Sequence, residues 1–534
     1  MHRLVVVALV MTMALAPATW AQPSASQVLR WNVGTDFETL DPAKSTGIPE
    51  ATVIYLLYEG LTQRDPQGRL VPGMAERWDV SKDGLTWTFY LRAAKWSNGQ
   101  LVSAGDFEFA WKRALDPALA ADYAYQLYYL KNGKAYNTGG IKDVSQVGVI
   151  AKDARTLVVT LESPTPFFGD LLSFHTLMPV PKTVVTGTPA WAGKPETFVG
   201  NGPFVMKEWT RQNRVVLERN PNYWDAKNIK LQRIEFSMIE AESTALVQYE
   251  AGQLDGSSNV PVADIPRLLK TGDFKAMPYI GTYYYLFNTT HKPLDDARVR
   301  RALAFAINRT LITARITRAG EKPANAFVPS GIVVNGTDFR QAGGPLMPVY
   351  DPALAKKLLA EAGYPNGITT ELWWPNRARP YLTQPQKIAE AIQAQLAKGG
   401  IRAKLVTYEW GTYLAKLKDG EQPMAIIGWI GDNGDPDNFL YVLLDKDNAV
   451  KGKANNYAFY TSEAVHTLLI NGQRVNDQAK RGAYYRQAQE IIHSDAPWVP
   501  LVHAARVGAH RKEVQNFTLH PLQIWWLHRV WISK

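Results

Sequence analysis

Gly428-Trp-Ile-Gly-Asp-Asn-Gly-Asp-Pro-Asp-Asn-Phe-Leu440 is the stretch of sequence that decides the fold. It follows the short apolar run Met424-Ala-Ile-Ile427, so the pattern predicts a buried strand that ends in a loop rich in aspartate, glycine and proline. Such a loop holds polar side chains still at a strand end, where α/β proteins tend to bind ligands. Asp432 is therefore the first candidate for a ligand contact.

The spacing of the aspartates in this loop excludes an EF-hand calcium site. An EF-hand loop needs oxygen ligands at positions 1, 3 and 5, Gly at position 6 and Glu at position 12. Counted from Asp432, Asp437 falls at position 6 and Leu443 at position 12. The alternative to a ligand site is that Asp432, Asp435 and Asp437 only form Asx-turns and helix caps.

The first 21 residues have the pattern of a secretory signal peptide. Arg3 precedes an apolar run from Leu4 to Leu15, and Ala18-Thr-Trp-Ala21 supplies small residues for cleavage, so the mature chain is expected to begin at Gln22. The sequence contains no cysteine, which excludes a disulfide, a thiolate site and a lipid-carrying cysteine at the cleavage point. These features predict a soluble protein of a bacterial periplasm.

Length and composition restrict the class of protein further. A chain of 534 residues exceeds what one core usually supports, so two or three domains are expected, and no later stretch approaches the roughly 20 apolar residues of a membrane span. The net charge of +10 is spread along the chain without Lys/Arg blocks, which disfavours nucleic acid as a partner. The 17 Trp and 24 Tyr residues suit either an ordinary core or the lining of a large enclosed pocket.

Periodicity predicts an antiparallel strand and a helix in the first third of the chain. Residues 85–91 alternate between apolar and polar side chains, which is the period of a half-buried strand. Ser103 with Asp106 three residues later resembles a capping box, which predicts a helix start. The apolar stripe of that helix comprises Phe107, Ala110, Trp111 and Ala114.

The second half of the chain predicts an α/β arrangement. Asp351-Pro352 has the form of an N-cap followed by proline at the first helical position, and Gly363 can end that helix in the left-handed region. Strand-like segments at 370–374 and 401–407 then flank a helical pattern, which supports the α/β class. The apolar positions of that helical pattern are Ile388, Ile392 and Leu396.

Several longer motifs follow one another along the mature chain. They are Leu70-Val-Pro-Gly-Met-Ala-Glu-Arg-Trp78, Asp83-Gly-Leu-Thr-Trp-Thr-Phe-Tyr-Leu-Arg92, Lys95-Trp-Ser-Asn-Gly99, Ser103-Ala-Gly-Asp-Phe107, Gly200-Asn-Gly-Pro-Phe204, Asn220-Pro-Asn-Tyr-Trp-Asp225, Thr282-Tyr-Tyr-Tyr-Leu-Phe-Asn288, Asp295-Asp-Ala-Arg-Val-Arg-Arg-Ala-Leu303, Gly363-Tyr-Pro-Asn-Gly367 and Trp498-Val-Pro-Leu501. In this order they resemble the periplasmic peptide-binding proteins of ABC importers, the oligopeptide- and dipeptide-binding proteins of the bacterial extracellular solute-binding protein family 5. The resemblance covers the mature chain.

The resemblance implies a type II-like periplasmic binding protein of three lobes, with a hinge and an enclosed ligand cleft. The hinge would consist of two chain crossings, near residues 280 and 500, and would place the aromatic run from Tyr279 to Tyr285 in the cleft. The implied boundaries are residues 22–58, 183–280 and 501–534 for lobe I, 59–182 for lobe II, and 281–500 for lobe III.

The resemblance also implies site residues. A free peptide presents an ammonium, a carboxylate and backbone amides, which suit a carboxylate, an Arg fork and exposed backbone groups respectively. Asp432 lies where the family binds the ammonium, and Arg379 lies where its dipeptide-binding members bind the carboxylate. Trp410, Tyr123 and Tyr284 are implied cleft residues, and Ile48 is implied to pair its backbone with the ligand. For Trp410, Tyr123 and Ile48, ordinary core packing is the alternative.

The preferred peptide length stays open. Arg379, Thr407-Tyr-Glu-Trp-Gly-Thr-Tyr413 and Lys418-Asp-Gly-Glu421 resemble the dipeptide-binding branch, whereas Trp111-Lys-Arg-Ala-Leu-Asp-Pro117 is closer to the oligopeptide-binding branch. That branch places a histidine and an arginine where this chain has Gln384 and Ile426. We expect a receptor for short oligopeptides, with a strict dipeptide-binding protein as the alternative.

Two other classes of protein are alternatives to a transport protein. A periplasmic hydrolase of the glycosidase type needs paired carboxylates, which spacing alone does not exclude, and a chaperone or adhesion surface also suits a soluble fold. The sequence contains no His-Glu-x-x-His, Gly-x-Ser-x-Gly or phosphate-loop motif. We therefore predict no catalysis, no metal and no cofactor, and a monomer whose partners are short peptides and membrane permease subunits, without nucleic acid.

Overall fold

The computed structural model describes residues 26–533 except 66–68, 259, 273, 319, 335–336, 340–347, 378, 380–383 and 519–526. The signal-peptide prediction for residues 1–21 therefore lies outside the described residues. None of the helices in the described ranges combines the length and hydropathy of a membrane span.

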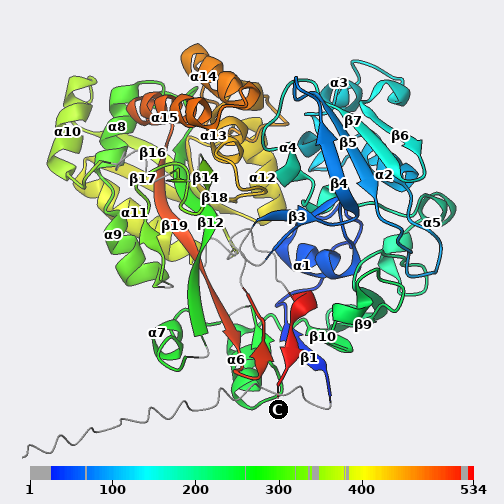
Figure 1. Cartoon of the computed structure of the whole chain (residues 1–534). Coiled ribbons are helices and arrows are strands. Elements are labelled where there is room, and N and C mark those ends of the chain that lie inside the picture. Colours follow the sequence, from blue (N-terminus) through cyan, green and yellow to red (C-terminus); the bar gives the residue numbers. More distant parts are fainter. Residues whose placement is uncertain are drawn as a thin grey trace, which may run out of the picture.

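An eleven-stranded mixed sheet, the large sheet, runs through the molecule (Figure 1). Its strands are β1 (Val28–Asn32), β8 (Phe204–Thr210), β9 (Arg214–Arg219), β10 (Arg233–Ser237), β11 (Gly256–Ser257), β12 (Phe274–Phe287), β13 (Lys322–Pro323), β16 (Ile368–Pro375), β17 (Ile401–Tyr408), β18 (Met424–Ile430) and β19 (Trp498–His510). Their spatial order is β17-β16-β18-β12-β19-β11-β1-β10-β9-β8, with β13 paired to β19.

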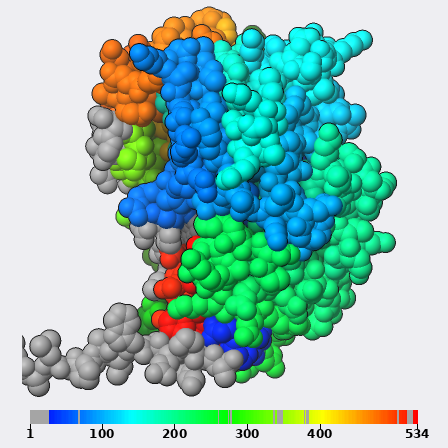
Figure 2. Space-filling model, turned by 45° about the vertical axis from the view of Figure 1, so that its right-hand side comes forward, coloured from blue at the N-terminus to red at the C-terminus, as the bar shows by residue number. Residues whose placement is uncertain are grey.

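A separate four-stranded antiparallel sheet, the small sheet, has the order β4-β5-β7-β6, with β4 (Ala75–Val80), β5 (Thr86–Leu91), β6 (Val149–Asp153) and β7 (Thr156–Thr160). Three two-stranded pairs complete the β structure: β2 (Thr62–Arg64) with β3 (Leu70–Pro72), β14 (Val333–Val334) with β15 (Thr337–Asp338), and β20 (Val514–Gln515) with β21 (Trp531–Ile532). Figure 2 shows the surface of the chain segment that contains the small sheet, in blue and cyan, beside the orange surface of the C-terminal helices at the top of the molecule.

The helices fall into two groups by their position in the chain, before and after β12. Those before β12 are α1 (Ile48–Leu57), α2 (Ala104–Ala114), α3 (Gly133–Asn137), α4 (Phe168–Leu171), α5 (Lys182–Gly187), α6 (Glu242–Glu250) and α7 (Ile265–Leu268). Those after it are α8 (Ala297–Phe305), α9 (Arg309–Ile312), α10 (Pro352–Glu361), α11 (Pro385–Lys398), α12 (Trp410–Asp419), α13 (Asp437–Leu444), α14 (Glu463–Arg474) and α15 (Gln478–Asp495).

The structure contains the local features that the sequence predicts. Ser103 and Asp106 make the capping box of α2, with the Ser103 N–H donating to Asp106 Oδ2 at 2.9 Å. Asp351 caps α10 by accepting bonds from the next two available N–H groups, and Gly363 beyond its end has a φ of 95°. The repeat β16–α11–β17–α12–β18 makes β16 parallel to both β17 and β18, so the predicted α/β class is confirmed.

β12 is an interior strand of the large sheet and lies between β18 and β19. It pairs with β18 through residues 281–287 and with β19 along most of its length, and the β12–β19 register is interrupted between Pro278 and Thr282. Its side chains alternate between two cores. Tyr284 and Leu286 join one apolar cluster and Tyr283 and Tyr285 join the other, so both faces of the strand are buried.

The charged run on α8 lies only partly in solvent. Arg298 and Arg301 are exposed, but Arg300 is buried. Its guanidinium donates to the carbonyls of Leu294 and Asp495 at 2.7 and 2.8 Å, so this buried cation has hydrogen-bond acceptors.

Candidate functional site

The loop between β18 and α13 is held by Asn438. Its side-chain oxygen accepts a hydrogen bond from the Asp432 N–H at 2.9 Å, and its Nδ2 donates to Asp432 Oδ2 at 3.1 Å. The Trp429 indole N–H also donates to Asn438 Oδ1, at 2.9 Å. A Cβ at Gly431 would lie 2.7 Å from Ile280, so only glycine lets the chain pass at this point. The loop therefore fixes both the backbone and the carboxylate of Asp432.

Two residues between α2 and α3 also form hydrogen bonds with the Asp432 carboxylate. The Tyr125 hydroxyl and the Gln126 amide donate to Asp432 Oδ2 at 2.8 and 2.7 Å. With Asn438, three donors therefore converge on one oxygen. Within the described residues, Asp432 Oδ1 accepts no hydrogen bond, so this oxygen is available to an additional donor.

Burial changes the acidity of Asp432. It raises the pKa of this carboxyl to about 6, although the hydrogen bonds from Asn438, Tyr125 and Gln126 act in the opposite direction. A carboxylate that is removed from water and has no cation beside it does not recover the hydration free energy of its charge. A cationic ligand group at Oδ1 would supply the missing charge.

The other two aspartates of the loop have structural partners. Both carboxylate oxygens of Asp435 accept bonds from Arg481 Nη2 at 2.9 Å, and Asp435 Oδ1 also accepts the Asp437 N–H at 3.0 Å. Asp437 accepts bonds from Gln473, Tyr485 and Tyr129 at 2.9, 3.2 and 3.1 Å. The turn-and-cap alternative thus describes Asp435, whereas the Asp432 side chain faces Tyr125 and Gln126.

Arg379 and Trp410, both candidate ligand contacts, lie together. The guanidinium carbon of Arg379 is 4.1 Å from the centroid of the Trp410 ring, a cation–π arrangement. Arg379 Nε is buried and has no hydrogen-bond partner among the described residues. Trp410 begins α12, where Glu409 accepts the Gly411 N–H at 2.9 Å. The start of α12 therefore fixes the position of the Trp410 indole, and the indole orients the Arg379 guanidinium.

Tyr123 lies beside Tyr125, with ring centroids 5.9 Å apart. Its half-buried ring packs edge-on against Phe174 and His175, with centroid distances of 5.1 and 5.7 Å. Burial lowers the pKa of His175 to about 4, so this histidine is neutral at neutral pH. Tyr125 and Gln126 were missed by the sequence analysis, because nothing local separates Tyr125 from its neighbour Tyr123.

Ile48 and Tyr284 have different environments. Ile48 is the first residue of α1 and its carbonyl accepts the Thr52 hydroxyl at 3.0 Å; the N–H groups of a first helical turn have no partner within the helix. The Tyr284 ring is 3 % exposed and lies 4.1 Å, centroid to centroid, from Trp498. In this conformation Tyr284 is a core residue, and ligand contact by either residue stays a prediction.

The two positions that depart from the oligopeptide-binding pattern are engaged elsewhere. Gln384 Nε2 donates to the Ile316 carbonyl at 2.8 Å, and Ile426 is fully buried in the core of the large sheet. Neither side chain offers a charge to a ligand.

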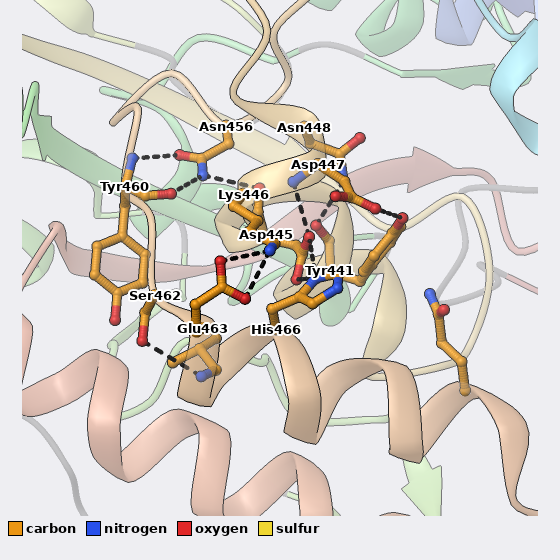
Figure 3. A network of polar contacts seen from close by, with 12 residues as sticks. Tyr441, Asp445, Lys446, Asp447, Asn448, Asn456, Tyr460, Ser462, Glu463 and His466 are labelled. Carbon is orange, nitrogen blue, oxygen red and sulfur yellow. Dashed lines mark hydrogen bonds and ion pairs between the residues drawn. The ribbon is translucent and has the colours of Figure 1, made fainter.

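A second polar cluster follows α13, about 12 Å along the helix from Asp437. Asp445, Asp447 and His466 each offer one possible metal-ligand atom, all within 4.8 Å of one another. The Asp445 carboxylate meets His466 Nδ1 at 3.0 and 3.1 Å, which is hydrogen-bonding distance, while Lys446 pairs with Glu463 (Figure 3). These contacts account for the cluster as a link between α13 and α14.

Comparison with known proteins places this geometry in a family. A family model described as bacterial extracellular solute-binding proteins, family 5 Middle, matches residues 69–451. The dipeptide-binding protein DppE of Bacillus subtilis is 34% identical over 508 residues, 94% of this chain and 91% of the relative. The periplasmic oligopeptide-binding protein OppA of Salmonella typhimurium is 33% identical over 529 residues, 96% of this chain and 94% of the relative.

The fold comparison agrees with the sequence comparison. The crystal structure of Haemophilus influenzae OppA in complex with the peptide RPPGFSPFR matches with a TM-score of 0.81 and 31% identity, covering 96% of this chain and 100% of that one. The predicted fold class, a type II-like periplasmic binding protein with mixed α/β content, is confirmed by this similarity.

Proposed function

The chain belongs to the bacterial extracellular solute-binding proteins of family 5, and on that premise we propose that it captures short peptides in the periplasm and delivers them to the permease of an ABC importer. The family consists of solute-binding proteins. Peptide capture without chemical change, by a monomer that needs no cofactor, is the finer proposal for this chain.

The geometry of Asp432 is the observation that carries the proposal. Three donors hold one of its oxygens and leave the other free, in a buried setting that raises the pKa of the carboxyl to about 6. The ammonium of a peptide supplies both hydrogen-bond donors and the missing positive charge. Arg379, oriented on Trp410, suits the carboxylate at the other end of a dipeptide.

The hydrolase alternative receives no support from the same loop. A glycosidase needs two carboxylates that face the substrate. Asp435 is neutralised by Arg481, and Asp437 is enclosed by Gln473, Tyr485 and Tyr129. Neither is available as a partner for Asp432.

We further propose that the chain forms three lobes with the boundaries expected above, and that β12 and β19 form the hinge. Support comes from the interrupted register between Pro278 and Thr282. It also comes from the hydrogen bond between Tyr125, in the proposed lobe II, and Asp432, in the proposed lobe III. Closure of these lobes on a peptide would exclude water from Asp432.

The proposal is tested with a mixed peptide pool analysed by mass spectrometry before and after incubation with the protein. We expect peptides to be retained unchanged by the wild type and lost by Asp432→Ala. Asp419→Ala, which removes an exposed carboxylate from α12, is the matched control and should retain peptides normally. Turnover of a peptide or glycan without retained ligand would overturn the proposal.

A further inference from the structure

A cavity of about 160 Å³ is lined by residues of α8, the end of α15 and the start of β19. Figure 1 shows α8 and α15 next to each other near the top of the view. Its wall includes neither Asp432 nor Arg379. Three aromatic residues line it, Phe305, Phe327 and Trp498 (the aromatic side), and so do three polar residues, Arg301, His493 and Ser494 (the polar side).

The volume and the aromatic side set the size and kind of occupant. An apolar protein cavity of ~150 Å³ accepts a benzene ring. The rings of Phe327 and Trp498 are fixed at right angles to each other, with centroids 4.9 Å apart, and Trp498 is in turn held by Tyr284. This side of the cavity is therefore preformed for one flat apolar group.

The polar side carries positive charge without a matching acid. Among the described residues, no Asp or Glu lines the cavity, and Arg301 forms no ion pair. The nearest acid in sequence, Asp495, accepts a bond from Tyr460 at 2.5 Å. The positive charges of Arg301 and Arg309 add to burial in lowering the pKa of His493, so the three basic groups lie near one another.

Within the described residues, two buried donors beside the cavity lack acceptors. Arg309 Nη2 donates at 2.6 Å to the carbonyl of Pro348, which lines the cavity, but Arg309 Nη1 is buried and has no partner among the residues that the structure describes. The same holds for the indole Nε1 of Trp498, whose side chain is 2 % exposed. Buried donors are normally satisfied, so an acceptor on a ligand would complete these two.

We propose that this cavity is a second ligand site, separate from the Asp432 site, and that it takes a small aromatic carboxylate. The ring occupies the aromatic side and the carboxylate lies at Arg301 and His493. A bare phosphate would meet the positive charge but would lose water against Phe305 and Phe327 without compensation. The inference does not depend on the proposed peptide binding.

Isothermal titration of the full chain with benzoate tests the site, with benzamide and inorganic phosphate as comparison ligands. We expect one benzoate per chain, and binding of benzamide and phosphate weaker by about tenfold or more, because each lacks either the charge or the ring. Phosphate binding as tight as benzoate, or no benzoate binding, would overturn the proposal.

Variants locate the site. Arg301→Glu, at an exposed position, should weaken benzoate by about tenfold or more, whereas Arg402→Glu, the same charge change on β17, should not. Ala304→Phe, which fills the cavity from α8, should abolish benzoate binding and spare peptide binding. Equal effects of the two arginine variants, or displacement of benzoate by peptide, would show that benzoate binds elsewhere and would refute the assignment.

Discussion

The Tyr125 hydroxyl and Asp432 Oδ2 are 2.8 Å apart, although 307 residues separate them in the chain. One residue follows α2 beside the small sheet and the other ends a strand of the large sheet. The candidate ligand carboxylate therefore also joins two segments that are far apart in the chain. Any change in its charge or occupancy is expected to affect how these segments meet.

Asp432→Ala should weaken peptide binding at every peptide length. The substitution leaves the peptide ammonium without its partner in a buried site, which costs ~3–5 kcal/mol, or about two to four decades in affinity. Calorimetry with a short peptide measures the loss, and Asp419→Ala serves as the control. Unchanged affinity in Asp432→Ala would mean that the ammonium binds elsewhere.

Peptide affinity should rise with pH and level off above about pH 6. The pKa of Asp432 is raised to about 6, so the carboxyl is protonated below that pH and has no charge to offer an ammonium. Binding therefore releases a proton on the acid side, and affinity falls by up to about tenfold per pH unit there. The peptide's own ammonium, with a pKa of about 8, stays charged throughout this range.

The measurement is calorimetry between about pH 5 and about pH 7 in buffers of different ionisation enthalpy, which reveals proton release directly. Asp432→Asn should bind weakly and show a flat profile across the same range. A wild-type profile as flat as that of the Asn variant would assign the titration to another group.

Arg481→Met should destabilise the fold, whereas Arg298→Ala should not. The Arg481–Asp435 pair is buried, with the two side chains 2 and 7 % exposed, whereas those of Arg298–Asp296 are 54 and 28 % exposed. Removing one member of the buried pair strands the other charge and costs ~3–5 kcal/mol. Urea unfolding gives the comparison, and Arg481→Met with Asp435→Asn should lose less than the sum of the single variants.

Local signals predicted much of the fold. The capping box at Ser103, the N-cap at Asp351 and the strand from Met424 each depend on residues close in sequence, and all three form. The Asp432 contacts with Tyr125 and Gln126 were not predictable in this way. They bring together residues more than 300 positions apart, and the sequence around Tyr125 contains no periodicity that would single it out.

Two further differences have the same origin. The apolar run that contains Tyr284 does not indicate which face of a strand meets ligand when both faces are buried. Arg300 stands in a charged helical pattern that is typical of a solvated face, yet it is buried, and one of its hydrogen-bond acceptors is the carbonyl of Asp495, 195 positions away. Roles in ligand binding, like the lobe boundaries, depend on such tertiary placement and stay predictions.

Ligand binding should make the protein more compact. If Tyr125 and Gln126 move with the small sheet relative to Asp432, a peptide that contacts both sides favours the closed arrangement. Small-angle scattering should then give a smaller radius of gyration at saturation than without ligand. An unchanged radius, with binding verified in the same sample, would exclude a closing hinge.

The last prediction concerns peptide length, and it separates the two branches that the sequence resembles. If Asp432 and Arg379 both hold termini, they define a fixed span, and a longer peptide must bulge or give up one charged contact. That contact is worth ~3–5 kcal/mol when buried, so the affinity for dipeptides would be higher by about two to four decades. If only Asp432 anchors a terminus, the Arg379 guanidinium stacked on Trp410 contacts the middle of a longer chain.

We expect the second case, in which Arg379→Ala scarcely changes the affinity for peptides of three to five residues while Asp432→Ala impairs them all. Gln384 and Ile426 offer no charge for the far carboxylate of such peptides, so that end must remain hydrated or meet other groups, and no single length should dominate. Calorimetry of a length series on the wild type and both variants decides the matter. A steep preference for dipeptides that disappears in Arg379→Ala would instead establish a strict dipeptide-binding protein, because only a fixed two-charge span produces that pattern.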